Sequence, residues 1–236
     1  MKTCIRHTRD VFFPIIQCER DERKKEPRFK KFLGTGFLIG DNGFLMTATH
    51  VIKSFEIKEL YALSVMNQKW FLLSFCNKID HSIEDISMLK IQVTSKLPKM
   101  WSSFVVPANS WEGPSLHFEL WGYSNITAYQ YTNCFQPQLC YEEGYIVKRL
   151  TDPENPNPLL KGKNFFETNL VGYKGYSGSP IISRTRKRSD AKWEMIGIYL
   201  GDYTTTIGDE KLARGIICRE DGIRDWLKDI DPDLYF

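Results

Sequence analysis

The sequence predicts a mostly β fold of two six-stranded antiparallel β-barrels followed by a C-terminal helix. The chain has 236 residues, 42% of them hydrophobic, which is enough for two small closed barrels with cores of their own. Most apolar segments are short and end at Gly, Pro, Asn or Asp, as strands do. These segments fall into two groups of six, and only the end of the chain has helical spacing.

The first six candidate strands are apolar runs bounded by turn residues, at residues 11–18, 35–39, 44–48, 60–65, 70–75 and 86–93. Between the second and the third, Asp41-Asn42-Gly43 is a tight-turn sequence that predicts a hairpin. Residues 97–114 then contain three prolines and no sustained alternation, which predicts a connection between barrels. We therefore place the first domain, a β-barrel, at residues 1–105.

Six further candidate strands follow, at residues 116–122, 141–148, 165–169, 180–183, 193–200 and 215–218. Ile223, Trp226, Leu227 and Ile230 are then spaced three, one and three residues apart, which is typical of one face of a helix. The second domain, residues 106–236, is accordingly a second barrel that ends in a helix packed on a barrel.

The charge of the chain does not point to a nucleic acid or an anionic membrane as partner, because the net charge is only +3. The basic stretches 20–31 and 184–188 are interpreted as solvated loops, since no base-reading motif accompanies either. No apolar run approaches the roughly 18 residues of a membrane helix, and no cleavage site of small residues follows the run 11–16. We expect a cytoplasmic protein with no signal peptide and no membrane contact.

The six cysteines are expected to be reduced, because a protein without an export signal stays in a reducing compartment. Cys134 and Cys140 are close enough in sequence to form a disulfide in an oxidising environment. No Cys-x-x-Cys or paired Cys/His spacing suggests zinc, so we expect no metal site.

Two segments of the first half place polar side chains at the ends of predicted strands. His50 follows the strand 44–48, and Asp85 stands directly before the strand that begins at residue 86. Each alone has an ordinary interpretation, His50 as a partly buried polar residue and Asp85 as a solvated acid. A carboxylate shielded at the mouth of a strand can instead hold an imidazole in one tautomer and stabilise its protonated form.

A third segment, Gly175-Tyr176-Ser177-Gly178-Ser179-Pro180, places a serine between two glycines in the second half of the chain. Glycine allows the sharp turn that exposes a serine hydroxyl, and Pro180 begins the next strand. A Gly- and Ser-rich turn between two strands also explains this segment when it is taken in isolation.

Together the three segments resemble the motifs of the trypsin/chymotrypsin-like serine peptidases. The match comprises the hairpin that ends in His50, a strand led by Asp85 that is similar to the family's D-I-A-L-L, and the G-x-S-G-S-P around Ser177. The order His, Asp, Ser, with separations of 35 and 92 residues, differs from that of subtilisin-like and α/β-hydrolase enzymes. The chain looks most similar to the glutamyl endopeptidase and HtrA-like branches, which lack the disulfides of secreted digestive enzymes.

The resemblance implies barrels of the chymotrypsin type and a serine endopeptidase that cleaves proteins or peptides without a cofactor. Ser177 would be the nucleophile, His50 the general base, and Asp85 the residue that orients His50. The amides of Gly175 and Ser177 would form the oxyanion hole. Residues 195–201 resemble the strand that pairs with the substrate.

By the family's pattern, seven residues would line the pocket for the side chain that precedes the cleaved bond: Val171, Gly172, Tyr199, Leu200, Gly201, Asp202 and Gly215. Val171 replaces the acidic residue at the base of a trypsin pocket, so we expect cleavage after medium-sized apolar residues rather than only after Lys or Arg. Asp202 near the rim is the feature that argues for basic residues.

Tyr176 stands where zymogens of the family carry an aspartate that pairs with a newly cut N-terminus. A neutral tyrosine cannot receive an ammonium group in this way, so we expect the loops 134–163 and 202–214, or a regulatory protein partner, to set the activity. Two alternatives stay open: a non-catalytic peptide-binding module derived from a protease, and a regulated protease subunit or domain of a larger intracellular protein.

Overall fold

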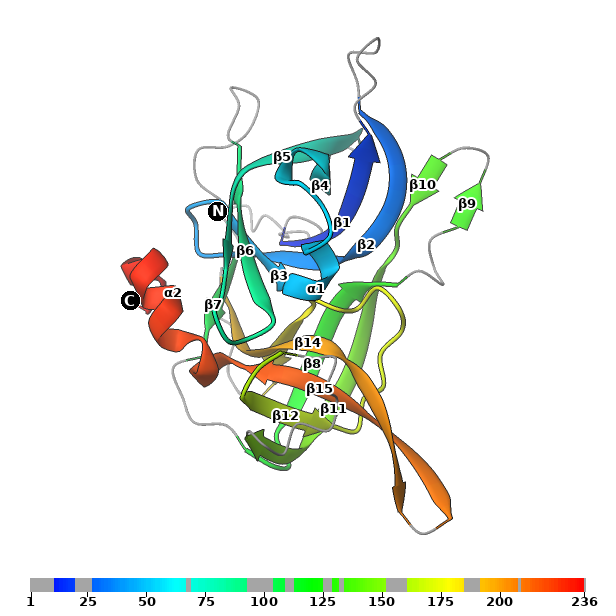
Figure 1. Cartoon of the computed structure of the whole chain (residues 1–236), viewed down its shortest axis with the longest axis vertical. Helices are drawn as coiled ribbons and strands as arrows, with labels where there is room; N and C mark the ends of the chain where they lie inside the picture. The colour runs from blue at the N-terminus through cyan, green and yellow to red at the C-terminus, as the bar shows by residue number, and fades with distance from the viewer. Residues whose placement is uncertain are drawn as a thin grey trace, which may run out of the picture.

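The computed structural model describes residues 11–19, 27–66, 69–92, 104–108, 113–124, 129–131, 134–151, 161–184, 192–207 and 209–235. Cys4, the end of the predicted strand 86–93, and most of the basic stretches and of the connection 97–114 lie outside these residues. The described residues form two groups of strands, with α1 (Thr49–Ile52) lying between them (Figure 1).

The strands of the first half close into an antiparallel barrel, drawn in blue to teal in Figure 1. They are β1 (Phe12–Glu19), β2 (Arg28–Ile39), β3 (Phe44–Ala48), β4 (Leu60–Met66), β5 (Lys69–Asp80) and β6 (Ile86–Ile91). The pairing runs β1–β4–β5–β6–β3–β2, and the pairing of β1 with β2 closes the ring. Because the ring is closed, it leaves no edge strand unpaired.

The second half forms another closed antiparallel ring, in the order β14–β13–β8–β11–β12–β15 with β15 paired back to β14. Its strands are β8 (His117–Tyr123), β11 (Leu139–Thr151), β12 (Asn164–Thr168), β13 (Pro180–Ser183), β14 (Lys192–Ile207) and β15 (Glu210–Arg219). The prediction of two six-stranded barrels is therefore confirmed.

Three further strands lie outside the two rings. β7 (Phe104–Pro107) pairs in parallel with β14 and, through Val105, with Ile39 of β2, so it joins the barrels. The predicted domain boundary between residues 105 and 106 falls within this strand. β9 (Tyr129–Tyr131) and β10 (Cys134–Gln136) form a separate two-stranded sheet.

Apolar side chains fill both barrels and the contact between them. Phe37, Met46 and Met88 are fully buried in the first barrel, and Phe118 and Ile181 are fully buried in the second. The cluster of the first barrel continues into the contact, which also contains buried residues of β8, β14 and β15. Burial of this apolar surface is the main force that holds the barrels together.

The predicted C-terminal helix is confirmed as α2 (Arg224–Ile230), with 3-10 turns before it (η3, Glu220–Gly222) and after it (η4, Pro232–Tyr235). It follows the second barrel in sequence but also contacts the first. Trp226 meets His81 edge-on, with ring centroids 5.2 Å apart, and Asn42 Nδ2 donates to Asp231 Oδ2 at 2.9 Å. None of the helices in the described residues is long and apolar enough to span a membrane.

Several strands are longer than predicted, among them β2, β5, β11, β14 and β15, and the added residues of β14 and β15 form an exposed hairpin arm without apolar alternation. The span 202–214, predicted to be a loop, is largely the arm of β14 and β15 that projects from the body in Figure 1. Much of the predicted loop 134–163 is β10 and β11. β7 was missed because it lies within residues 97–114, whose three prolines predicted a connection between the barrels.

Within the described residues, Cys18, Cys76, Cys140 and Cys218 form no disulfide. The side chain of Cys134, which the sequence allowed to bridge Cys140, lies outside the described part of the structure. Burial raises the pKa of the Cys18 thiol to about 11, which keeps this thiol protonated and unreactive at neutral pH.

Candidate active site

His50 and Asp85 meet because of the register between two paired strands. β3 and β6 pair with Ala48 opposite Ile86, so the residues just after β3 lie beside those just before β6. The backbone N–H of His50 donates to Asp85 Oδ1 at 3.0 Å, and His50 Nδ1 lies 2.5 Å from Asp85 Oδ2. Asp85 therefore binds both the main chain and the ring of His50.

The environment of this pair suits a base held by a carboxylate. The side chain of Asp85 is only 5% exposed, whereas that of His50 is 28% exposed. A buried carboxylate is tolerated where donors satisfy it, and Asp85 has two from His50 alone. A hydrogen bond to Nδ1 places the ring proton on that atom, so Nε2 is left as the acceptor.

Ser177 lies in the tight loop between β12 and β13. The glycines before and after it have positive φ angles, +108° at Gly175 and +88° at Gly178, a region in which other residues are strained. A Cβ atom on Gly175 would lie 2.5 Å from Phe32 Cε1, and one on Gly178 would lie 2.1 Å from Thr35 O. The loop therefore requires glycine at both positions.

Thr35 of β2 connects the first barrel to the serine loop, and sequence reasoning did not single it out. Its N–H donates to the carbonyl oxygen of Ser177 at 3.0 Å, and its Oγ1 donates to that of Gly175 at 2.9 Å. The same Oγ1 accepts the Tyr123 N–H at 2.8 Å, and Thr35 is fully buried. A threonine between two glycines is the only signal in the sequence, and it does not reveal these long-range bonds.

The serine loop also lies beside the turn that carries His50. A Cβ atom on Gly34 would lie 2.9 Å from Ser177 O and 3.0 Å from the γ-methyl groups of Val51, the residue after His50. Ser177 Oγ donates to the carbonyl oxygen of Leu200 at 3.0 Å. The hydrogen bonds of the described residues do not include one between Ser177 and His50, so the structure brings the two segments together without that bond.

Among the described residues, the amides predicted to form the oxyanion hole have no acceptor. The N–H groups of Tyr176, Gly178 and Ser179 all donate to backbone carbonyls, but those of Gly175 and Ser177 donate to no other described residue. Two such donors on one loop can bind an oxygen atom that carries negative charge.

Tyr199 lies at the centre of the residues predicted to line the specificity pocket. It is 1% exposed, and its Oη accepts the Gly172 N–H at 2.7 Å. Gly215 is also close, because a Cβ atom there would lie 3.0 Å from Tyr199 Cε2. Val171, also predicted to line the pocket, is 40% exposed.

The other three predicted pocket residues follow Tyr199 on β14. Leu200 is buried in the cluster between the barrels, and Asp202 is exposed on the projecting arm. At Gly201, a Cβ atom would meet nothing within 4 Å, so this part of the strand borders open space. The pairing of β14 with β13 ends at Ile198, which leaves one edge of Leu200 and Gly201 without a strand partner among the described residues.

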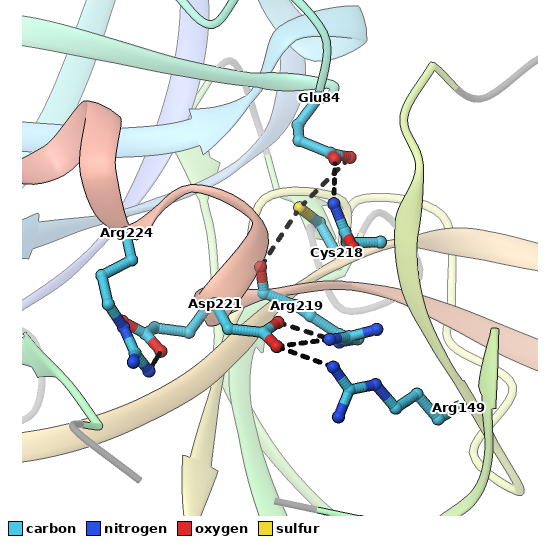
Figure 2. Close-up of polar contacts among 8 residues, drawn as sticks. Glu84, Arg149, Cys218, Arg219, Asp221 and Arg224 are labelled. Atoms are coloured by element: carbon cyan, nitrogen blue, oxygen red, sulfur yellow. Dashed lines mark hydrogen bonds and ion pairs between the residues drawn. The ribbon is translucent and has the colours of Figure 1, made fainter. Parts of the chain in front are cut away.

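Glu84, next to Asp85, connects the first barrel to the second, although sequence reasoning set it aside. Glu84 is buried and accepts the Lys163 N–H at 3.1 Å and Asn164 Nδ2 at 3.0 Å. The Cys218 thiol lies 3.9 Å from its Oε2, as Figure 2 shows. Burial raises the pKa of the Glu84 carboxyl above its ordinary value, although the neighbouring donors lower it in part.

An ion-pair network on the second barrel lies close to Glu84. Arg219, whose side chain is 2% exposed, binds Asp221, and Asp221 also accepts from Arg149 at 3.0 Å (Figure 2). Asp221 thus joins the end of β15 to β11. The strand that carries Cys218 is in this way fixed directly after its contact with Glu84.

Tyr176 is anchored within its own barrel. It is 1% exposed, its Oη donates to Glu142 Oε1 at 3.2 Å, and its ring meets that of Tyr173 edge-on. Burial raises the pKa of the Tyr176 hydroxyl far above its ordinary value, so this side chain is neutral. The residue before Ser177 is therefore held by β11.

Comparison with known proteins identifies the fold. No family model and no curated protein matches the sequence. Among solved structures, the chain is similar to neuropsin, a serine protease expressed in the limbic system of mouse brain, with a TM-score of 0.63 and 16% sequence identity. The match covers 97% of each chain. At this identity the likeness is one of architecture, and the chain has the chymotrypsin-like fold of the trypsin-like serine proteases.

Proposed function

We propose that this chain is a serine endopeptidase that hydrolyses peptide bonds in proteins or peptides. One observation carries the proposal: the Ser177 loop, with two amides that donate to no other described residue, lies beside a histidine whose Nδ1 is bound by a buried carboxylate. The fold, shared with a serine protease, supports the same conclusion. The members of the site are Ser177, His50, Asp85 and the amide of Gly175.

In the first half of the reaction, Ser177 Oγ turns from the Leu200 carbonyl toward His50 Nε2 by rotation about its Cα–Cβ bond. Nε2 takes the hydroxyl proton while Oγ attacks the carbonyl carbon of the substrate. The carbonyl oxygen becomes an oxyanion, which accepts hydrogen bonds from the amides of Gly175 and Ser177. Asp85 stabilises the imidazolium cation through Nδ1–H.

In the second half, His50 gives the proton to the leaving amine nitrogen, and the C–N bond breaks to leave an ester on Ser177. Water then attacks this ester, with His50 Nε2 accepting the water proton and returning it to Ser177 Oγ. The carboxylic acid product leaves and the serine is restored. Loss of one oxyanion donor from such a site costs about 3–4 kcal/mol of transition-state stabilisation.

The substrate is proposed to bind in extended form along β14. Leu200 and Gly201 have one edge without a strand partner in the described structure, and open space lies over Gly201. An extended peptide that pairs with this edge would gain main-chain hydrogen bonds whatever its sequence. Its carbonyl groups would then pass beside Ser177, whose hydroxyl already contacts Leu200.

A fluorophosphonate probe tests the proposal, because it labels only an activated serine. Purified protein whose intact mass shows an unprocessed N-terminus should be labelled on Ser177 and should cleave unfolded protein substrates. Ser177→Ala should abolish both labelling and cleavage. Because Tyr176, the residue before Ser177, is bound by Glu142 of β11, we expect labelling without removal of any N-terminal segment.

Ser179→Ala is the matched control, since it removes a hydroxyl from the same loop. Ser179 Oγ is buried and makes no hydrogen bond to the described residues, so its loss should leave labelling intact. Full proteolysis by Ser177→Ala would refute the assignment. A folded wild-type protein that binds peptides but is never labelled would favour the non-catalytic module instead.

A further inference from the structure

Tyr199 lies beside the Ser177 loop, among the residues predicted to line the pocket for the side chain that precedes the cleaved bond. We propose that Tyr199 closes this space and restricts that substrate residue to glycine or alanine. The inference rests on the proposed function, because it concerns the specificity of the same site.

The backbone around Tyr199 runs directly past Ser177. Ser177 Oγ donates to Leu200 O at 3.0 Å, and the Gly178 N–H donates to Tyr199 O at 2.8 Å. The Tyr199 N–H in turn donates to Ser179 O at 2.9 Å. The substrate side chain that precedes the cleaved bond lies next to the carbonyl carbon that Ser177 attacks. To enter the protein, this side chain must therefore pass the segment that carries Tyr199.

The walls of this space are in contact with the tyrosine ring. A Cβ atom on Gly172 would lie 2.7 Å from Cε1, Cζ and Oη of Tyr199. On the opposite side, a Cβ atom on Gly215 would lie 3.0 Å from Tyr199 Cε2 and 2.1 Å from the carbonyl oxygen of Leu170. Distances this short leave no room for another side chain between the walls.

The ring is also fixed in place. Tyr199 is 1% exposed and packs with Phe166 and Ile217 in the core of the second barrel. Its Oη accepts the Gly172 N–H at 2.7 Å, and burial keeps this hydroxyl neutral. Movement of the ring out of this position would break that bond and expose apolar surface, so substrate binding does not displace it easily.

The sequence alone led us to expect cleavage after medium-sized apolar residues, on the evidence of Val171. Val171 is 40% exposed and Asp202 lies on the exposed arm, whereas Tyr199 is buried and its ring touches both Gly172 and Gly215. The Tyr199 ring therefore closes the bottom of the pocket. The preferred residue before the cut should therefore be smaller than valine, with basic, acidic and aromatic residues excluded by size.

A peptide library with cut sites read by mass spectrometry tests the inference. Wild-type protein should cleave after Gly or Ala with a kcat/KM at least about 100-fold above that for Leu or Phe. Tyr199→Ala should raise cleavage after Leu and Phe at least about 10-fold, because it empties the space between Gly172 and Gly215. Tyr199→Phe, which keeps the ring, should retain the wild-type preference.

Tyr145→Ala is the control for loss of a tyrosine ring elsewhere, since Tyr145 is 43% exposed on β11, and its profile should match wild type. Circular dichroism and fluorophosphonate labelling establish that each variant is folded and has an active serine. Wild-type cleavage after large residues, or a folded Tyr199→Ala with an unchanged profile, would overturn the inference while leaving the peptidase intact. If Tyr199→Ala does not fold, the wild-type profile alone decides. A wild-type protein without labelling or cleavage would overturn the proposed function and this inference with it.

Discussion

Replacement of Thr35 by valine removes the hydroxyl through which the first barrel holds the serine loop. Valine has almost the shape of threonine, so the change consists of a methyl group in place of Oγ1. Two hydrogen bonds are lost: the donation to Gly175 O at 2.9 Å and the acceptance of the Tyr123 N–H at 2.8 Å. Because Thr35 is fully buried, water cannot replace either bond.

The size of the effect follows from these two bonds. Each buried polar group that loses its partner costs about 1–3 kcal/mol, and the buried methyl group offsets a part of the sum. We expect the free energy of unfolding to fall by about 2–4 kcal/mol. The bond from the Thr35 N–H to Ser177 O remains, so kcat should fall only about 10-fold, less than the loss of a whole oxyanion donor.

Urea unfolding and steady-state kinetics measure the two effects, and affinity for a peptide boronate reports on the oxyanion hole. Thr168→Val is the control, since Thr168 Oγ1 also donates to a backbone carbonyl, that of Tyr145, and accepts a backbone N–H, that of Leu170, besides a longer contact of 3.5 Å to Asn169 Oδ1. It should lose comparable stability without weaker boronate binding. A Thr35→Val protein within about 0.5 kcal/mol of wild type, with full kcat, would show that Thr35 does not position the loop.

Two further substitutions test the acidic pair at the barrel contact. Asp85→Asn should lower kcat by about 10³–10⁴-fold. An amide has only one oxygen for the two donors that His50 presents, so the His50 ring would take the wrong tautomer. Retention of kcat to within about 10-fold would contradict this role of Asp85. Glu84→Gln should flatten the pH dependence of the free energy of unfolding. The pKa of Glu84 is raised in the folded protein, so Glu84 contributes stability that is fully present below the ordinary glutamate pKa of 4.5. This stability is lost as the pH rises through the pKa of Glu84 in the folded protein. Urea unfolding from about pH 4 to about pH 8 should therefore show the variant gaining on wild type as pH rises, and parallel curves would argue against a raised pKa.

Much of the fold could be predicted because its information is local. Short apolar runs between turn residues gave all twelve barrel strands, and β3 and β13 have the predicted limits. The spacing of Ile223 and Leu227 predicted the helix in which both are buried. The histidine, aspartate and serine segments were equally local, since each needs only a particular residue at the end of a strand or in a glycine turn. The prediction of a loop at residues 202–214 failed for a reason that is also local. The arm of β14 and β15 has no buried face, so its sequence lacks the alternation that marks a strand.

Only the tertiary structure decided how the barrels meet. Thr35 acts on Gly175 from 140 residues away and Glu84 on Asn164 from 80 residues away, and neither pairing leaves a pattern in the sequence. The same holds for Tyr199, which by sequence was one residue in a pocket wall and in the structure fills the space between Gly172 and Gly215. Side-chain periodicity reports which face of a strand is buried, but not which distant backbone that face meets. The packing of two closed barrels against each other makes these contacts, and the chemistry proposed for this protein depends on them.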